Sequence, residues 1–196
     1  MHVIDHGRKY IEKNYERPFF DKFLRNFLSK VLPNTNYFKL TSYLVKFGKM
    51  FQFIFPKKIQ NMMELMPTSF PEKTLKVKEK YPAKGKKIAR VALLTGCVQK
   101  ELSPQINEST IRLLNRHGVE VVVPKKIRCC GSLNHHLGKE TDANSDFVNN
   151  IETWYEEHKK GNLDAILSNT SGCGTTLKDY GFIFRNDKKL KDKAKK

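Results

Sequence analysis

The second half of the sequence alternates short apolar runs with helical segments, and this alternation constrains the fold more than any other feature. The predicted strands are 88–95, 119–123 and 163–168. The predicted helices between and after them are 104–117, 141–160 and one that begins near Thr175. Strands that alternate with helices favour parallel pairing, because crossover connections are right-handed. We therefore expect residues 88–196 to form an α/β domain with a small parallel sheet.

The first 66 residues follow a different pattern, with Phe-rich stripes at helical spacing. This spacing is found in 19–32, in a segment from about Phe38, and in the short, Met-rich segment 59–66. The second of these carries Lys39, Lys46 and Lys49 away from its apolar side. A basic amphipathic helix of this kind fits either an anionic membrane surface or packing against the rest of the protein. Because the stripes are wide and recur, we expect helices that pack.

Residues 67–87, between these two regions, are rich in Pro, Lys and Glu and poor in apolar side chains. Such a composition is typical of a linker. The sequence thus predicts a helical region over 1–66, a linker over 67–87 and a cysteine-rich domain over 88–196.

The whole chain is strongly basic, since 37 Lys and Arg against 20 Asp and Glu give a net charge of +17. This balance attracts anionic partners, but no recognisable nucleic-acid motif is present, and no nucleic-acid partner is expected. The first ten residues lack the apolar core of an export signal, and no stretch approaches the roughly 20 apolar residues of a membrane span. We expect a cytoplasmic protein, with peripheral attachment to the inner face of the cell membrane as an open alternative.

Each cysteine position follows the carboxyl end of a predicted strand. Cys97 follows the first strand, Cys129 and Cys130 follow the second, and Cys173 follows the third, just before the last helix. Ligands of open α/β sheets bind outside these strand ends. The four thiols are therefore expected to share one edge of the sheet, with neighbouring glycines that let the backbone approach a bulky group.

Four thiolates at one place suit an iron–sulfur cluster or tetrahedral zinc, and the residues alone do not choose between them. Four unrelated buried cysteines are the alternative, but such residues usually lie inside apolar strands rather than in Gly-rich loops. His135 and His136 follow Cys130 closely enough to act as further ligands, although a hydrogen-bonding pair is favoured. No catalytic triad, phosphate loop or pair of acid–base carboxylates stands out, so no catalytic residue is assigned.

The motifs at Cys97, at Cys129-Cys130-Gly131 and at Cys173 resemble the CCG cysteine-rich domain of heterodisulfide reductases and related respiratory iron–sulfur subunits. That family shows one Cys, a long gap, Cys-Cys-Gly, and a later Cys-x-x-Cys. Positions 98–128 form the gap here. The last motif keeps its second Cys but has Thr170 in place of the first.

The stretches 91–99, 116–124 and 171–181, together with the helical front from Asp5 to Pro18, resemble the iron–sulfur subunits of bacterial glycolate oxidases. The resemblance implies an electron-transfer subunit without a substrate site of its own, in which the four cysteines bind an iron–sulfur cluster. It also implies a separate flavin subunit, carrying FAD, that oxidises glycolate to glyoxylate and sends electrons through this chain toward respiratory quinone. An iron–sulfur subunit for D-lactate or another 2-hydroxy acid, and a zinc-stabilised interaction module, are the alternatives.

Members of this family also carry a ferredoxin-like region before the helical front and a second CCG repeat after the first. Neither is found in this sequence. The chain is therefore expected to be a fragment, with the cysteine-rich domain over 88–196 truncated at its C-terminal end.

Overall fold

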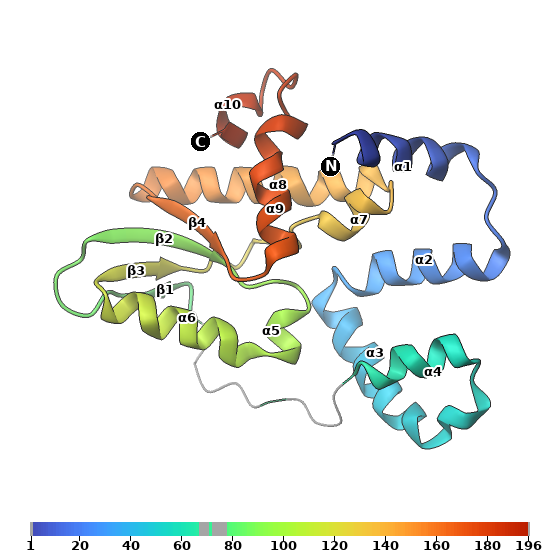
Figure 1. The fold of residues 1–196 in the computed structure, drawn as a ribbon. Coiled ribbons are helices and arrows are strands. Elements are labelled where there is room, and N and C mark those ends of the chain that lie inside the picture. Colours follow the sequence, from blue (N-terminus) through green and yellow to red (C-terminus); the bar gives the residue numbers. More distant parts are fainter. Residues whose placement is uncertain (1, 67–70, 72–77, 196) are drawn as a thin grey trace.

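The structure is a computed structural model that describes residues 2–66, 71 and 78–195. Its strands are β1 (Lys80–Tyr81), β2 (Ala89–Leu94), β3 (Val119–Val122) and β4 (Ala165–Ser168). Its helices are α1 (His2–Asn14), α2 (Phe19–Val31), α3 (Thr35–Gly48), the 3-10 helix η1 (Lys49–Ile54), α4 (Lys57–Glu64), α5 (Gln99–Leu102), α6 (Pro104–Arg116), α7 (Ser132–His136), α8 (Glu140–Lys160), α9 (Ser171–Ile183) and α10 (Lys191–Lys195). Figure 1 shows helices α1 to α4 beside the α/β unit that the remaining elements build.

The sheet has the strand order β1-β3-β2-β4. Strand β2 pairs in parallel with β3 on one side and with β4 on the other, so the prediction of an α/β fold with a parallel sheet is confirmed for these three strands. Parallel pairing needs crossover connections, which α6 supplies between β2 and β3 and α8 supplies between β3 and β4.

The fourth strand, β1, comes from the segment that the sequence suggests is a linker. Lys80 pairs with Val122 and Tyr81 with Val121, antiparallel to β3. A two-residue strand is too short to produce a visible alternation of side chains, but it covers an edge of β3 that would otherwise be open. Much of the predicted linker, 67–70 and 72–77, lies outside the described residues.

The two faces of the sheet are covered by different helices, in three layers (Figure 1). The residues packed together on the α6 face are Val91, Leu93, Val121 and Ile111. Those packed together on the opposite face, with α8 and α9, are Ala92, Leu94, Val122, Phe147, Ile151, Trp154 and Tyr180. Neighbouring residues of a strand point to opposite faces. Burial of both faces explains why β2 and β3 are apolar at nearly every position.

The helical region contacts the α/β unit through polar groups of α1 and α2. The Arg25 guanidinium donates a hydrogen bond to the carbonyl oxygen of Leu137 at 2.9 Å. The Asp5 carboxylate lies 2.9 Å from Nδ1 of His136 in α7. No helix within the described residues is long and apolar enough to cross a membrane.

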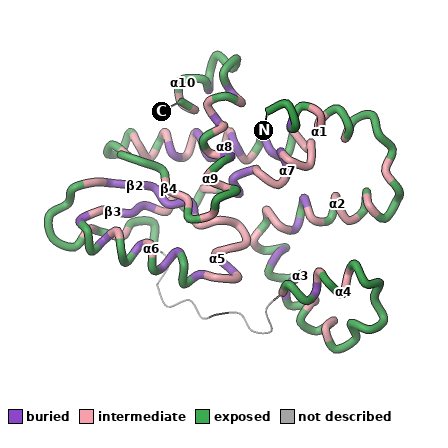
Figure 2. Tube along the Cα trace, in the orientation of Figure 1, coloured by how far each residue is buried: buried purple, intermediate pink, exposed green. Residues whose placement is uncertain are grey.

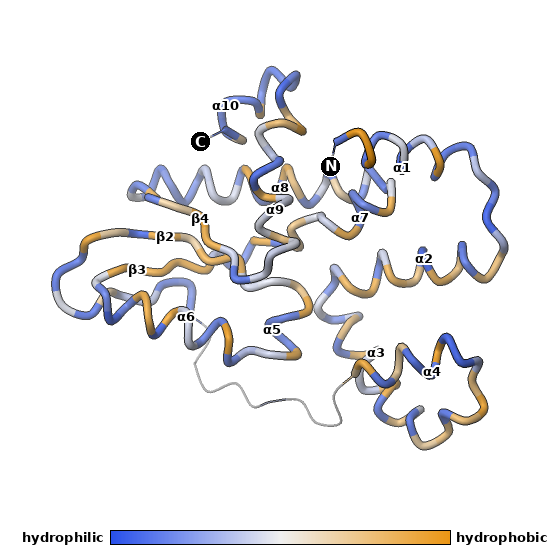
Figure 3. The backbone as a smooth tube through the Cα atoms, in the orientation of Figure 1, coloured by the Kyte–Doolittle hydropathy of each residue, from blue (hydrophilic) through white to orange (hydrophobic). Residues whose placement is uncertain are grey.

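The expectation that the Phe-rich stripes pack against the rest of the protein is wrong for much of 1–66. Phe19, Phe47 and Phe53 are 85%, 69% and 76% exposed, whereas Phe38 of α3 is 3% exposed. Figure 2 shows α3 and α4 as largely exposed, and Figure 3 shows hydrophobic stretches along the same course. Helical periodicity marks the apolar side of a helix but does not say what covers it, and within the described residues little covers these stripes.

Candidate metal centre

All four cysteines lie beyond the carboxyl ends of the parallel strands, at one edge of the sheet. Cys97 follows β2 through the turn at Thr95 and Gly96, while Cys129 and Cys130 come between β3 and α7. Cys173 follows β4. Because β2 lies between β3 and β4, these connections leave three neighbouring strands at the same edge.

The four sulfurs form two close pairs. The Sγ of Cys129 lies 3.5 Å from that of Cys97, and the Sγ of Cys130 lies 3.1 Å from that of Cys173. All four are free thiols, with Cys129 and Cys130 buried and the other two half-buried. Among the residues that the structure describes, no three Cys, His, Asp or Glu side chains surround one common metal position. The adjacency of Cys129 and Cys130 in the chain joins the two pairs into one site.

The last helix begins earlier than the sequence suggests, and this changes the setting of Cys173. Helix α9 starts at Ser171, so Cys173 lies in its first turn rather than before it. Thr170 is the N-cap residue, and its hydroxyl hydrogen-bonds to the Gln99 side chain near the site. Gly172 and Gly174 are typical of a loop, but glycine is least costly at a helix end, where fewer intrahelical bonds depend on it.

Two buried polar side chains fix the backbone of Cys129 and Cys130. Asn150 of α8 is fully buried; its amide nitrogen donates to the carbonyl oxygen of Cys129 at 2.8 Å, and its oxygen accepts from the backbone N–H of Arg128 at 2.9 Å. The Tyr180 hydroxyl of α9 donates to the carbonyl oxygen of Cys130 at 3.0 Å. Sequence reasoning missed both roles, because a polar residue on a helix face carries no signal of a partner so distant in sequence.

Gly131 closes the Cys-Cys-Gly turn in a way that other residues do not allow. Its φ of +74° lies in the left-handed region, which L side chains rarely adopt. A Cβ at this position would also lie 2.3 Å from Cε1 of Phe147. The third residue of the motif therefore lets the chain turn tightly against the aromatic core directly after the cysteine pair.

Burial and mutual hydrogen bonding shift the pKa values of the thiols. The hydrogen bond with Cys129, together with burial, raises the pKa of Cys97 above its ordinary value. The pKa of Cys129 is raised to about 12, chiefly by its hydrogen bond with Cys130. The bond with Cys129 lowers the pKa of Cys130, but the bond with Cys173 and burial outweigh it and raise the value to about 12. The hydrogen bond from Cys130 lowers the pKa of Cys173. A bound cation would stabilise the thiolate form of all four.

The two histidines after the cysteine pair contact an acid of the helical region. Nδ1 of His136 lies 2.9 Å from Oδ1 of Asp5, and Nε2 of His135 lies 3.6 Å from Oδ2. Asp5 is 4% exposed, and the ring of His135 lies beside that of Phe147, with 5.7 Å between the centroids. The hydrogen-bonding role accounts for these contacts and ties α1 to the helix that follows Cys130.

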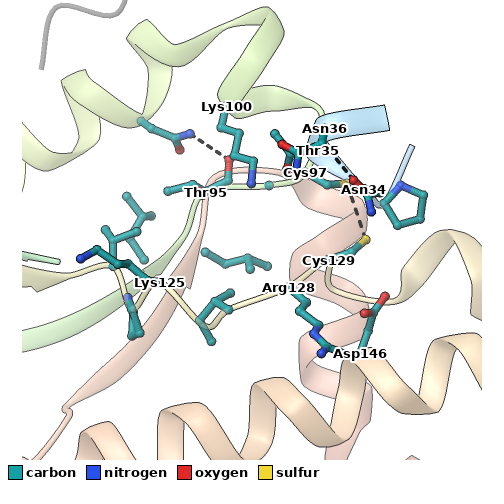
Figure 4. Close-up of a pocket in the computed structure, with 18 of the residues that line it drawn as sticks. Asn34, Thr35, Asn36, Thr95, Cys97, Lys100, Lys125, Arg128, Cys129 and Asp146 are labelled. Carbon is teal, nitrogen blue, oxygen red and sulfur yellow. Dashed lines mark hydrogen bonds between the residues drawn. The ribbon is translucent and has the colours of Figure 1, made fainter. Parts of the chain in front are cut away.

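A cavity of about 890 Å³ opens beside Cys97 and Cys129, between the α2–α3 turn and the edge of the sheet. Figure 4 shows the two sulfurs next to one another at this cavity, with Lys100, Arg128 and Asp146 around it. Burial raises the pKa of Asp146 to about 6, against the effect of the Arg128 charge. Asn134 also lines the cavity, and its side-chain oxygen is buried without a hydrogen-bond partner in the described part of the chain.

The residues present fit a metal or an iron–sulfur group. Four free thiols provide the soft ligand set that iron–sulfur clusters and zinc prefer. The unpartnered oxygen of Asn134 marks a polar position in the wall of the adjoining cavity. Asn150 and Tyr180 bind the backbone carbonyl groups of Cys129 and Cys130, which leaves the sulfurs of these two residues free to face the other cysteines.

Comparison with known proteins agrees with this geometry. A family model described as a cysteine-rich domain, CCG, matches residues 91–178. The chain is 32% identical over 193 residues to the glycolate oxidase iron-sulfur subunit of Escherichia coli (strain K12), an alignment that covers 98% of this chain and 44% of that protein. It is 30% identical over 107 residues to lactate utilization protein A of Bacillus subtilis (strain 168), covering 55% of this chain and 42% of that protein.

The probable glycolate oxidase iron-sulfur subunit of Bacillus subtilis (strain 168) is 26% identical over 142 residues, covering 72% of this chain and 31% of that protein. The chain thus spans less than half the length of each of these relatives. No solved structure matches it. The matched region begins within β2, ends within α9 and includes all four cysteines, so the α/β unit contains a CCG cysteine-rich domain.

Proposed function

We propose that this chain is the cluster-binding, electron-transferring part of an iron–sulfur subunit of a 2-hydroxy-acid oxidase. Cys97, Cys129, Cys130 and Cys173 would be the ligands. The observation that carries the proposal is that four free thiols, which follow three separate strands, lie together at one edge of the sheet. Their sulfurs form two pairs, with Sγ–Sγ distances of 3.5 and 3.1 Å. Four unrelated core cysteines would have no reason to gather in this way.

The protein's own contribution is to position and shield the site. Helices α8 and α9 hold the backbone of Cys129 and Cys130 through Asn150 and Tyr180. The aromatic core of Phe147, Tyr180 and Trp154 lies behind the pair and keeps water from that side. A bound iron–sulfur cluster would accept and donate single electrons, and its potential would respond to this burial and hydrogen bonding.

The two half-buried cysteines, Cys97 and Cys173, would give the site its approach from outside. A redox partner exchanges electrons most readily across such a partly exposed side. The electron donor is proposed to be a flavin subunit that oxidises glycolate, and the final acceptor is proposed to be respiratory quinone, through a quinone-reducing or membrane-bound partner. The names of the relatives support glycolate or lactate as the 2-hydroxy acid.

The proposal is tested by reversible reduction of the reconstituted full chain. After anaerobic treatment with iron and sulfide, dithionite should bleach a visible chromophore, and mild reoxidation should restore it. Cys97→Ser and Cys130→Ser should each remove or strongly weaken this chromophore. Gly7→Ala is the control, because it changes a residue of α1 where an added Cβ meets no atom within 4 Å.

Two outcomes would contradict the proposal. A chain that binds zinc tightly and shows no chromophore after reconstitution would be a zinc-stabilised interaction module. A chromophore that survives in every Cys→Ser variant would show that the cluster lies elsewhere or is bound nonspecifically.

A further inference from the structure

Helix α3 and the 3-10 helix η1 carry an exposed apolar surface on the helical region. We call it the α3–η1 surface, and its members, each more than half exposed, are Leu40, Tyr43, Leu44, Phe47, Met50, Phe53 and Ile54. In Figure 1 this part of the chain projects from the α/β unit. Monomeric proteins rarely leave so many large apolar side chains together in water without a binding role.

The surface is one stripe rather than scattered side chains. Leu40, Leu44 and Phe47 are spaced by four and three residues, which places them on one side of α3. The side that α3 buries is a different one, with Phe38 and Ser42 at 3% and 2% exposure. The ring of Phe47 lies 6.1 Å from that of Phe51, centroid to centroid, so the stripe of α3 continues into η1.

The segment that carries this surface is basic. Between Asp21 and Glu64 the sequence contains no acidic residue, whereas it contains eight Lys and Arg. Three of these eight form ion pairs with acids from elsewhere in the chain: Arg25 with Glu12, Lys39 with Glu101 and Lys58 with Asp21. Lys46 stands one position before Phe47 of the stripe, so it flanks the stripe on the helix. Lys57 and Lys58 follow η1 at the start of α4. A long lysine side chain can extend past an apolar stripe to reach negative charge beside it.

We propose that the α3–η1 surface docks onto a bilayer that contains anionic phospholipid, with α3 lying in the plane of the interface. An apolar stripe rich in Leu, Phe and Tyr, flanked by lysines, is the pattern of helices that lie on membranes. Lipid headgroups supply negative charge for basic residues such as Lys46 and Lys57, which form no ion pair within the described part of the chain. A second copy of the chain would bring the same excess of positive charge to the contact, which opposes self-association.

This inference does not depend on the bound cluster or on the redox role of the four cysteines. Docking would involve α3 from Leu40 onward, η1 and the start of α4, which do not line the cavity beside Cys97 and Cys129, whereas the first turn of α3 does. Membrane binding and cluster binding can therefore succeed or fail separately. If both hold, the electron carrier would sit beside the membrane that contains its acceptor.

The test is flotation of the full chain with vesicles. One set of vesicles contains phosphatidylcholine alone, and the other an equal mixture of phosphatidylcholine and phosphatidylglycerol. The chain should float with the mixed vesicles and bind the neutral ones far less, and added salt should weaken the binding. Leu40→Ser, Leu44→Ser and Phe47→Ser combined should lower the partition coefficient at least about tenfold. Leu113→Ser is the matched control, since Leu113 is 58% exposed on α6, away from this surface.

The lysines give a second, independent comparison. Lys46→Gln combined with Lys57→Gln should weaken binding to the mixed vesicles by about fivefold for each lysine that faces the headgroups. The same substitutions at Lys188 and Lys189, which are exposed near the C-terminal end, should have little effect. Equal losses in the two pairs would mean that net charge, and not this surface, attracts the chain.

A single added tryptophan gives a readout that leaves the stripe apolar. Phe53→Trp should show a blue-shifted emission on mixed vesicles, whereas Leu113→Trp should not. The proposal is overturned if the native chain binds neither vesicle, if the triple serine variant binds as well as the native chain, or if Phe53→Trp shows no shift. A dimer that forms through this surface without vesicle binding would assign it to a second copy and would also overturn the proposal.

Discussion

Tyr180 donates a hydrogen bond from its hydroxyl to the carbonyl oxygen of Cys130, with 3.0 Å between the two oxygens. Asn150 makes the matching contact to the carbonyl oxygen of Cys129 at 2.8 Å. The two side chains come from α9 and α8, and Tyr180 is 3% exposed. The backbone of the cysteine pair is therefore fixed by two helices that are distant in sequence. Because the backbone is fixed, these buried contacts also determine where the two sulfurs lie.

Removal of the Asn150 amide should loosen the cysteine pair. Asn150→Ala leaves the carbonyl of Cys129 and the N–H of Arg128 without their buried partner, and each such loss costs about 1–3 kcal/mol. We expect a lower free energy of unfolding in urea and a weakened or shifted chromophore in the reconstituted protein. An unchanged free energy of unfolding would show that the amide is not needed to hold this turn.

The Tyr180 hydroxyl is tested by a substitution that keeps the ring. Tyr180→Phe should lower the free energy of unfolding by about 1–2 kcal/mol, because the carbonyl of Cys130 loses its donor. Tyr10→Phe is the control, since Tyr10 is 67% exposed on α1 and loses the same atom in water. Equal effects of the two substitutions would contradict a special role for the buried hydroxyl.

Two glycines should respond in opposite directions to alanine. Gly131→Ala introduces a Cβ at a φ of +74° and 2.3 Å from Phe147, so we expect a loss of at least about 2–3 kcal/mol and of cluster binding. Gly7→Ala lies in α1 with no atom within 4 Å and should raise stability by about 0.5–1 kcal/mol. Thermal unfolding of both variants measures the contrast. A tolerated Gly131→Ala would contradict the close packing of the turn.

The buried carboxylate of Glu120 should make stability depend on pH in the acid range. Its side chain is 7% exposed and lies 3.0 Å from Nζ of Lys80 and from Nε of Arg90. Burial raises the pKa of Glu120, but the hydrogen bonds and charges of Lys80 and Lys87 outweigh it and hold the pKa below the ordinary 4.5. The unfolded chain therefore binds this proton more tightly, and stability is lost as the pH falls below about 4.5.

Glu120→Gln measures this contribution directly. The variant should be less stable than the native chain by about 1.5–3 kcal/mol near neutral pH, and the difference should shrink as the pH falls, because the native side chain becomes neutral as well. Glu16→Gln, at an exposed position between α1 and α2, should show no such pH-dependent difference. A constant difference across pH would mean that the charge of Glu120 is not what stabilises the fold.

Asp5 should hold α1 against α7. Asp5→Ala removes the acceptor near Arg8, His135 and His136, which we expect to cost about 1.5–3 kcal/mol of local stability. Hydrogen exchange should speed up in α1 and α7 while β2 and β3 stay protected. Asp21→Ala, whose partner Lys58 lies 3.4 Å away at the surface, is the control. Unchanged exchange in α1 would contradict this link between the helical region and the site.

Much of the fold follows from local patterns in the sequence. The apolar runs that predict the strands match β2, β3 and β4 to within a few residues, and the helix predicted over 141–160 is α8. The edge location of the cysteines also follows, because the positions of strand ends fix where the following loops begin. What local patterns omit is the two-residue β1, which forms only because β3 offers it an edge.

The contacts around the site depend on the tertiary fold and carry little local signal. Asn150 and Tyr180 occupy ordinary helical positions, and only the packing of α8 and α9 brings them to the cysteine pair. The start of α9 at Ser171 could not be predicted from the sequence, because Gly172 and Gly174 locally favour a loop. The apolar stripe that contains Phe47 has the pattern of a helix side that packs in the core, although it is exposed. Periodicity reports amphipathicity, and the partner of an apolar face is a property of the whole surface.

The most direct test of the proposed site is the metal content of the chain. The full protein should be purified without oxygen, reconstituted with iron and sulfide, and assayed for iron, acid-labile sulfide and zinc per chain alongside its visible spectrum. The proposal predicts iron and sulfide in stoichiometric amounts with a brown chromophore, all lost in Cys130→Ser. Zinc without sulfide, or iron and sulfide retained undiminished in Cys130→Ser, would contradict it.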